Sequence, residues 1–182
     1  MLQGDFGESF MTGSSISDKI VQRLPATMEL ALMATFFAIL IGLPLGIISA
    51  VYRNSPLDYT TSVFSVAGIS IPGFWLSMLL IMLLSLKLDW LPASGYVPFF
   101  EDPLKSMKLM FMPAIGIGAS LAGTITRQTR NAVLEVLDQD YMMTAKAKGL
   151  PGHVMIWKHA LRNALLPIIT QCGMTFGAML GG

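Results

Sequence analysis

The distribution of charge along this chain constrains its fold more than any motif does. Four stretches contain no Asp, Glu, Lys or Arg, and they cover residues 30–52, 59–86, 109–126 and 163–182. A helix needs about 20 apolar residues to cross a bilayer, so each stretch is a candidate span. A soluble bundle would need four helices that are apolar on every side, whereas soluble surface helices keep a polar face. Charged residues make up only 13% of the chain, against about 25% in soluble domains. The sequence therefore predicts an all-α membrane protein.

We place the spans at about residues 28–52, 59–86, 109–127 and 165–182, within a membrane domain covering residues 25–182. Residues 1–24 and 87–108 then share one side, with five basic residues, and residues 53–58 and 127–162 share the other, with seven. The positive-inside rule makes the second side cytoplasmic and residues 1–24 extracytoplasmic. Residues 1–24 do not resemble a signal peptide that could carry them across the membrane, so we expect at least one span before them. We also expect further sequence after the last residue, because the fourth apolar stretch ends with the chain.

Glycine and proline interrupt the first two spans. Pro44 lies between Gly42 and Gly46, and a Pro72–Gly73 pair breaks the second apolar stretch within the sequence SIPGFW. Small residues let membrane helices approach closely, and non-helical backbone at membrane depth lines a cavity or is buried in protein. Ordinary packing and a pathway or hinge role both remain open. The candidate pathway or hinge residues are Pro44, Pro72, Gly73, Phe74 and Trp75.

The sequence contains no pattern typical of catalysis or metal binding. The two histidines, His153 and His159, are six residues apart and fall on different faces of a helix. Neither HExxH, CxxC, GxSxG nor a phosphate-binding loop is present, so we expect no catalytic and no metal-binding residue. No ionisable residue lies near the middle of a span, which argues against a proton- or ion-coupled transporter. The net charge of +1 gives no indication of nucleic-acid binding.

The expected cytoplasmic loop, about residues 128–164, is the most polar part of the chain. Residues 137–149 are expected to form a short helix, with acidic residues in its first turn, basic residues in its last turn and Gly149 as its stop. A second amphipathic helix is expected from about 151 to 166, near the membrane surface, leading into the last span at Pro167. A short capped helix here fits a docking element. A helix lying on the protein's own spans or on lipid headgroups is the alternative.

The segment DYMMTAKAKGL, followed by HALRNALLPIIT, closely resembles the cytoplasmic EAA loop of permeases of ABC importers. GDFGESF, RLPATMELA, GLPLGIISA, SIPGFW and WLPASGY extend this resemblance to the dipeptide, oligopeptide and nickel branch over essentially the whole chain. The resemblance implies a type I importer helical bundle with about four of the usual six spans present. It implies a multi-pass protein of the prokaryotic plasma membrane that transports peptides or a related small solute such as nickel.

In that family the short helix of the loop is a coupling helix that docks on a cytoplasmic ATPase. The resemblance implies ATPase-coupling residues Asp140, Tyr141, Thr144, Ala145, Ala147, Lys148, Gly149 and Leu150. It also implies a second permease subunit, two ATPase subunits and an extracytoplasmic substrate-binding protein as partners. No cofactor is expected in this subunit, because the partner ATPases would bind ATP and Mg. The general motif has Glu-Ala-Ala where this chain has Met143-Thr144-Ala145, so docking should depend on shape more than on a carboxylate.

Overall fold

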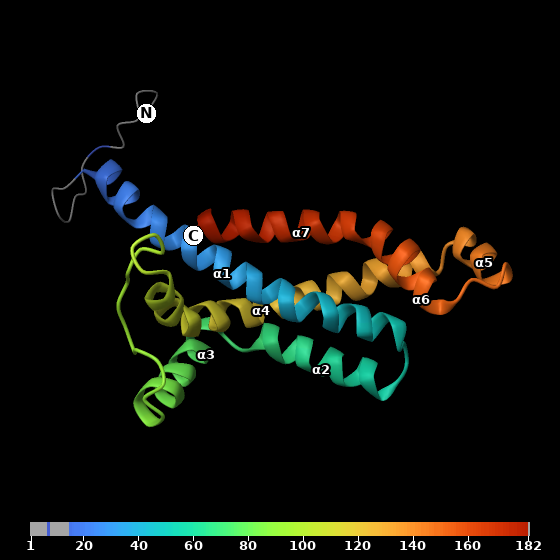
Figure 1. Ribbon diagram of the computed structural model, residues 1–182, viewed down its shortest axis with the longest axis horizontal. Coiled ribbons are helices and arrows are strands. Elements are labelled where there is room, and N and C mark those ends of the chain that lie inside the picture. The colour runs from blue at the N-terminus through green and yellow to red at the C-terminus, as the bar shows by residue number, and fades with distance from the viewer. Residues whose placement is uncertain (1–6, 8–14, 182) are drawn as a thin grey trace.

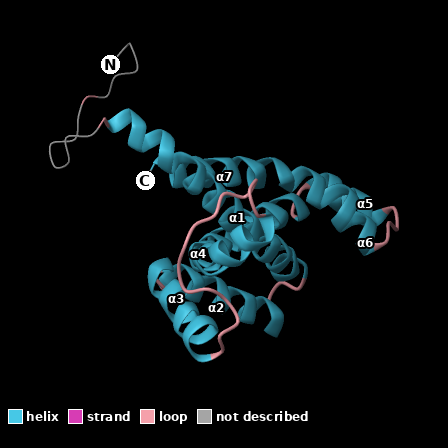
Figure 2. Ribbon diagram, turned by 60° about the vertical axis from the view of Figure 1, so that its left-hand side comes forward, coloured by secondary structure: helices cyan, strands magenta, loops and turns pink. Residues whose placement is uncertain are grey.

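The computed structural model describes Gly7 and residues 15–181, and residues 15–181 form helices and loops without a β-strand. Part of the expected extracytoplasmic segment, residues 1–6 and 8–14, lies outside the described residues. The helices are α1 (Ile16–Val51), α2 (Pro56–Ser70), α3 (Gly73–Leu80), η1 (Ile81–Lys87), α4 (Pro103–Leu137), α5 (Asp140–Ala147), α6 (Gly152–Val154), η2 (Met155–Ala160) and α7 (Leu161–Gly181). η1 and η2 are π-helical segments that continue α3 and α6. Figure 2 shows this helical organisation, in which residues 88–102 form a long loop between η1 and α4.

Helices α1 and α4 form the centre of the molecule and lie side by side (Figure 1). Small residues make this close approach possible. A Cβ atom on Gly46 would lie 2.5 Å from the Cβ of Thr129, and one on Gly42 would lie 2.8 Å from the carbonyl oxygen of Ala122. The expected small-residue pair at Gly42 and Gly46 therefore serves the contact between these two helices.

The second apolar stretch is broken. The span expected over residues 59–86 contains the break expected at Pro72 and Gly73: α2 ends at Ser70, and the helix that begins at Gly73 is bent from it by 96°. Pro72 has no N–H to continue the hydrogen bonding of α2, and its ring disfavours a helical conformation of Ile71. Ile71 accordingly has an extended conformation, with φ −85° and ψ 121°.

Helix α4 ends at Leu137, ten residues beyond the expected end of its span at residue 127. Gly152 to Gly181 then form one uninterrupted helical run through α6, η2 and α7, with Pro167 inside α7. We expected a separate helix ending near residue 166 and leading into the last span at Pro167. A membrane helix can tolerate the one hydrogen bond that proline removes, and the run continues through it.

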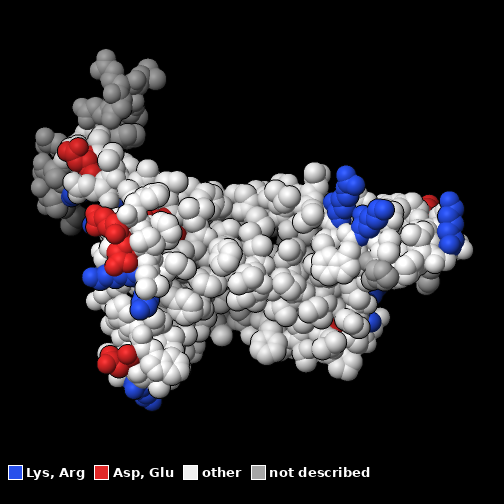
Figure 3. Space-filling view, in the orientation of Figure 1, with Lys and Arg blue, Asp and Glu red and all other residues white. Residues whose placement is uncertain are grey.

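Three of the described helices are long and apolar enough to cross a membrane, and a fourth span is possible if the bent pair counts as one. Figure 3 shows that charged side chains on the visible face gather at the two ends of the molecule and leave the middle uncharged. One charged end holds the start of α1 and the long loop, and the other holds α5 and α6. Apolar material thus separates two polar ends, as a membrane-spanning bundle requires.

Candidate functional site

Helix α5 lies at one end of the molecule, beyond the central pair of helices (Figure 1). It begins at Asp140, separated from the end of α4 by two residues, and has eight residues. The chain reverses after it through Gly149, whose φ is +76°. The amide of Lys148 donates to the carbonyl oxygen of Thr144 at 3.0 Å, and the amide of Leu150 donates to that of Ala145 at 3.3 Å. The structure confirms the predicted glycine stop, because glycine takes positive φ without steric cost.

One residue of α5 anchors the helix to the rest of the molecule. Met142 is 1% exposed and packs into a core cluster with residues from α1, α4, η2 and α7. This cluster contains Ala50, Ala132, Val133, Val136, Met142, Ala160, Ala164 and Ile168. Helix α5 is therefore seated on the ends of the long helices through its Met142 side chain.

The other side of α5 is open. Asp140, Tyr141, Met143, Thr144, Ala147, Lys148 and Gly149 are exposed, and Ala145 and Leu150 are partly buried. The structure thus brings all eight sequence-predicted coupling residues together on one short helix and the turn that follows it. A depression between α5 and η2 is lined by Leu137, Met142, Met143, Ala147 and Met155. The depression is therefore lined by apolar side chains, and the exposed helix beside it also presents Asp140 and Lys148.

Tyr141 also has a structural role that the sequence did not predict. Its hydroxyl accepts a hydrogen bond from Nδ2 of Asn163 at 2.7 Å. Asn163 belongs to α7, so this bond joins the first turn of α5 to the start of the last helix. Tyr141 thereby helps to fix the orientation of α5.

Of the candidate pathway or hinge residues, Pro72 to Trp75 lie together at the start of α3 and Pro44 lies in α1. Pro44 lies within α1, which continues through it as a helix. Pro72 and Gly73 form the 96° break, and a Cβ on Gly73 would lie 3.0 Å from the carbonyl oxygen of Gly116 on α4. Phe74 and Trp75 follow the break and are 66% and 48% exposed.

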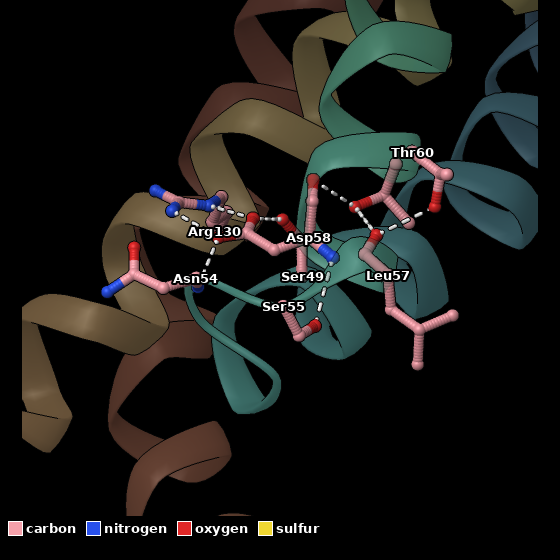
Figure 4. A network of polar contacts seen from close by, with 8 residues as sticks. Ser49, Asn54, Ser55, Leu57, Asp58, Thr60 and Arg130 are labelled. Carbon is pink, nitrogen blue, oxygen red and sulfur yellow. Dashed lines mark hydrogen bonds and ion pairs between the residues drawn. The ribbon is translucent and has the colours of Figure 1, made fainter.

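An ion pair with a buried carboxylate and a partly buried guanidinium joins α2 to α4 near the end of the molecule that carries α5 (Figure 4). Nε and Nη2 of Arg130 each donate to one carboxylate oxygen of Asp58 at 2.9 Å. The carboxylate also accepts from the Ser49 hydroxyl at 2.5 Å and from the amide of Asn54 at 2.9 Å. Asp58 is 3% exposed, and these four bonds occupy both of its oxygens. Two-pronged pairing of this kind is the strongest form of a carboxylate–guanidinium contact.

Sequence reasoning missed this pair. Asp58 and Arg130 are 72 residues apart in the sequence. Asp58 directly precedes the second apolar stretch and Arg130 lies shortly after the third, so the sequence alone shows each as an ordinary charge beside a span. The local sequence NSPLD does indicate a helix start, with Ser55 as N-cap accepting from the Asp58 amide at 3.3 Å. It gives no sign that the side chain of Asp58 turns inward.

The described bundle, with a short glycine-terminated helix at one polar end, is that of a helical membrane domain. Residues 42–182 match the family model described as binding-protein-dependent transport system inner membrane component. The chain belongs to this family. The family description and the apolar helices together make it a multi-pass protein of the cytoplasmic membrane.

Several curated relatives cover the whole chain. A putative peptide transport system permease protein of Brucella suis is 38% identical over 98% of this chain and 57% of its own length. The oligopeptide transport system permease protein AppB of Bacillus subtilis is 39% identical over 100% of this chain and 58% of its own length. The glutathione transport system permease protein GsiC of Salmonella typhi is 38% identical over 100% of this chain and 57% of its own length. The chain thus spans less than three-fifths of the length of these relatives.

The fold also matches a solved structure. The methionine ABC transporter MetNI, in an inward-facing conformation, contains a chain that aligns with a TM-score of 0.69. The alignment covers 91% of this chain and 74% of that chain, at 21% identity. This similarity supports the fold of an ABC importer permease.

Proposed function

We propose that this chain is the permease subunit of an ATP-driven, binding-protein-dependent importer for peptides or a related small solute such as nickel. It would form part of the translocation path and receive movement from cytoplasmic ATPase subunits through α5. The observation that carries this proposal is the geometry of α5, an exposed, glycine-terminated helix seated on the ends of the long helices through Met142.

The proposed partners are a second permease subunit, two cytoplasmic ATPase subunits and an extracytoplasmic substrate-binding protein. The ATPases would bind ATP and Mg, and this subunit would need no cofactor and perform no hydrolysis. Relatives named as peptide, oligopeptide and glutathione transport permeases support the solute class. The family description itself specifies dependence on a binding protein.

Movement of the ATPases would act on this subunit mechanically. When ATP brings two ATPase subunits together, a groove on each would carry its coupling helix with it. Ala145, Ala147 and Gly149 lack bulk on the α5 segment, so a partner backbone can approach them closely. Met142 would pass the displacement to the helix ends that share its core cluster. The long helices would then rock between inward- and outward-facing arrangements.

The test is a substitution at the glycine stop. Gly149→Glu adds a side chain where φ is +76° and where the partner groove would lie, so we expect normal amounts of protein in the membrane and loss of ATP-driven uptake. Gly152→Glu is the matched control, because Gly152 is exposed, has no atom within 4 Å of an added Cβ and does not have a positive φ. The assay measures solute uptake and ATP hydrolysis in vesicles that contain the complete transporter with its binding protein. Normal uptake by Gly149→Glu would refute the role of α5, and a wild-type complex without ATP-dependent uptake would refute the proposed function.

A further inference from the structure

The inward face of α2 is polar, although the helix lies in a membrane bundle. Its buried residues are Asp58, Thr61 and Ser65. Asp58 pairs with Arg130, and the Ser65 hydroxyl donates to the carbonyl oxygen of Gly123 at 3.0 Å. Both of these partners belong to α4. In a bilayer the hydrophobic effect does not drive helices together, so contacts of this kind and close packing determine which helices associate.

The helix that holds Arg130 is also the helix that leads directly to α5. Only Asp138 and Gln139 separate the end of α4 from the first residue of α5. Arg130 lies seven residues before Leu137, which corresponds to about 10 Å along the helix axis. The attachment point of α2 is therefore close to the element that would receive movement from the ATPases.

The corner between α1 and α2 supplies hydrogen-bond donors to the Asp58 carboxylate. Asn54 has a φ of 62°, an orientation that asparagine adopts more readily than most residues, and its amide donates to Asp58. Ser49, near the end of α1, donates to the other carboxylate oxygen. One carboxylate thus joins α1, the corner and α4, as Figure 4 shows.

We propose that Asp58 and Arg130 act as positioning residues that clamp α2 and the α1–α2 corner to α4, so that displacement of α5 moves α1, α2 and α4 as one unit. This inference rests on the proposed function, because it assigns the clamp to the transmission of movement from α5. Met142 joins α5 to α1, α4 and α7 through apolar contacts, and α2 has no residue in that cluster. The ion pair adds a charged connection between α2 and α4 at the end nearest α5, beyond the Ser65–Gly123 hydrogen bond.

A second ion pair at the same corner provides a control. Arg53 and Asp138 lie 3.6 Å apart, and their side chains are 53% and 69% exposed. Exposed pairs contribute little, because water and salt screen them. Arg53→Ala therefore removes a positive charge from the corner without opening the clamp. Asp58→Asn opens the clamp with almost no change of volume, and Asp58→Asn combined with Arg130→Gln opens it without leaving a buried charge unpaired.

The first measurement is the distance between α2 and α4 in the complete transporter. Spin labels are placed at Val63→Cys on α2 and Asn131→Cys on α4, both exposed positions, in a background with Cys172→Ser. We expect one narrow distance distribution in the otherwise unchanged protein, and the same distribution with and without ATP. Asp58→Asn and the double variant should broaden it, and Arg53→Ala should not. A distribution that stays narrow when the clamp is opened, or that changes with ATP when the clamp is intact, would overturn the inference.

The second measurement is the amount of solute taken up per ATP hydrolysed. Coupling energies between sites correspond to changes of roughly 5- to 150-fold, so we expect a fall of about tenfold in Asp58→Asn and in the double variant. The amount of assembled transporter should be unchanged in the double variant. If the ion pair only stabilised the fold, the fall in solute taken up per ATP would be accompanied by a fall in the amount of assembled transporter. An unchanged ratio in the double variant would also overturn the inference. If wild type shows no ATP-driven uptake, the proposed function fails, whereas the nucleotide-free distance measurement still decides whether the clamp holds α2.

Discussion

The contact between α1 and α4 leads to a quantitative prediction at Gly46. A Cβ at this position would lie 2.5 Å from the Cβ of Thr129 and 2.7 Å from the carbonyl oxygen of Thr126. The first atom is attached directly to the backbone of α4 and the second is part of it, so no side-chain rotation can relieve the overlap. Gly46→Ala must therefore push the two helices apart. We expect an overpacking cost of about 1–3 kcal/mol.

The same substitution also has a favourable effect, because alanine has a higher helix propensity than glycine by about 1 kcal/mol. Gly173→Ala is the matched control. Gly173 lies within α7, and an added Cβ there would have no atom within 4 Å. The control variant should gain the propensity term alone, whereas Gly46→Ala gains that term and loses the overpacking cost. The difference between the two variants isolates the packing effect at about 1–3 kcal/mol.

The assay is reversible unfolding of the purified chain in mixed micelles, with increasing amounts of a denaturing detergent. Helix content is followed by circular dichroism, and the free energy of unfolding is obtained for both variants and for the unchanged chain. We expect Gly46→Ala to be less stable than Gly173→Ala by the amount derived above. Equal free energies of unfolding for the two variants would refute the reasoning, because the close approach of α1 and α4 would then carry no energetic consequence.

Two further predictions concern the attachment of α5. Met142→Ala removes a side chain that is 1% exposed and should destabilise the α5 region by about 2–5 kcal/mol, measured as faster amide hydrogen exchange over residues 140–147. Met143→Ala, at a neighbouring position that is 66% exposed, should leave that exchange unchanged, and equal effects of the two variants would contradict the seating of α5. Tyr141→Phe removes the acceptor for Asn163 and should cost about 0.5–1.5 kcal/mol, seen as a smaller increase in exchange over the same residues. No increase would show that this bond does not hold the helix.

The sequence predicted the end of a long helix well where the uncharged stretch and the helix end together. It predicted the end less well where the helix continues into charged sequence. Apolar stretches located α1 and α4, but Arg127 and Arg130 ended the third stretch while α4 continues to Leu137. A helix outside the bilayer core tolerates charge, so loss of hydrophobicity marks the end of a span and not the end of a helix. Pro72 correctly indicated a break, but its 96° angle and the close approach of Gly73 to Gly116 of α4 are seen only in the structure.

The short helix that carries the proposed coupling residues could be predicted from the sequence, because its residues are contiguous. Residues 140–150 form one short helix and its turn, and Gly149 indicated its end without any tertiary information. The clamp could not be found in this way, because Asp58 and Arg130 meet only after α2 and α4 pack. Pro167 misled for the opposite reason, since proline often ends a soluble helix but remains inside α7.

Helix α5 is attached through an apolar side chain and helix α2 through polar groups, because the two helices lie in different surroundings. Met142 lies beyond the central helices, where burying an apolar side chain gives a preferred position to α5. Helix α2 lies beside α4 among apolar side chains, and apolar surface can face lipid as readily as protein. Its inward face therefore has to be specified by groups that lipid cannot satisfy, and Asp58 and Ser65 are such groups. It follows that substituting apolar residues on the outward face of α2 should leave its position unchanged, whereas exchanging Asp58 for a residue of equal size should release it.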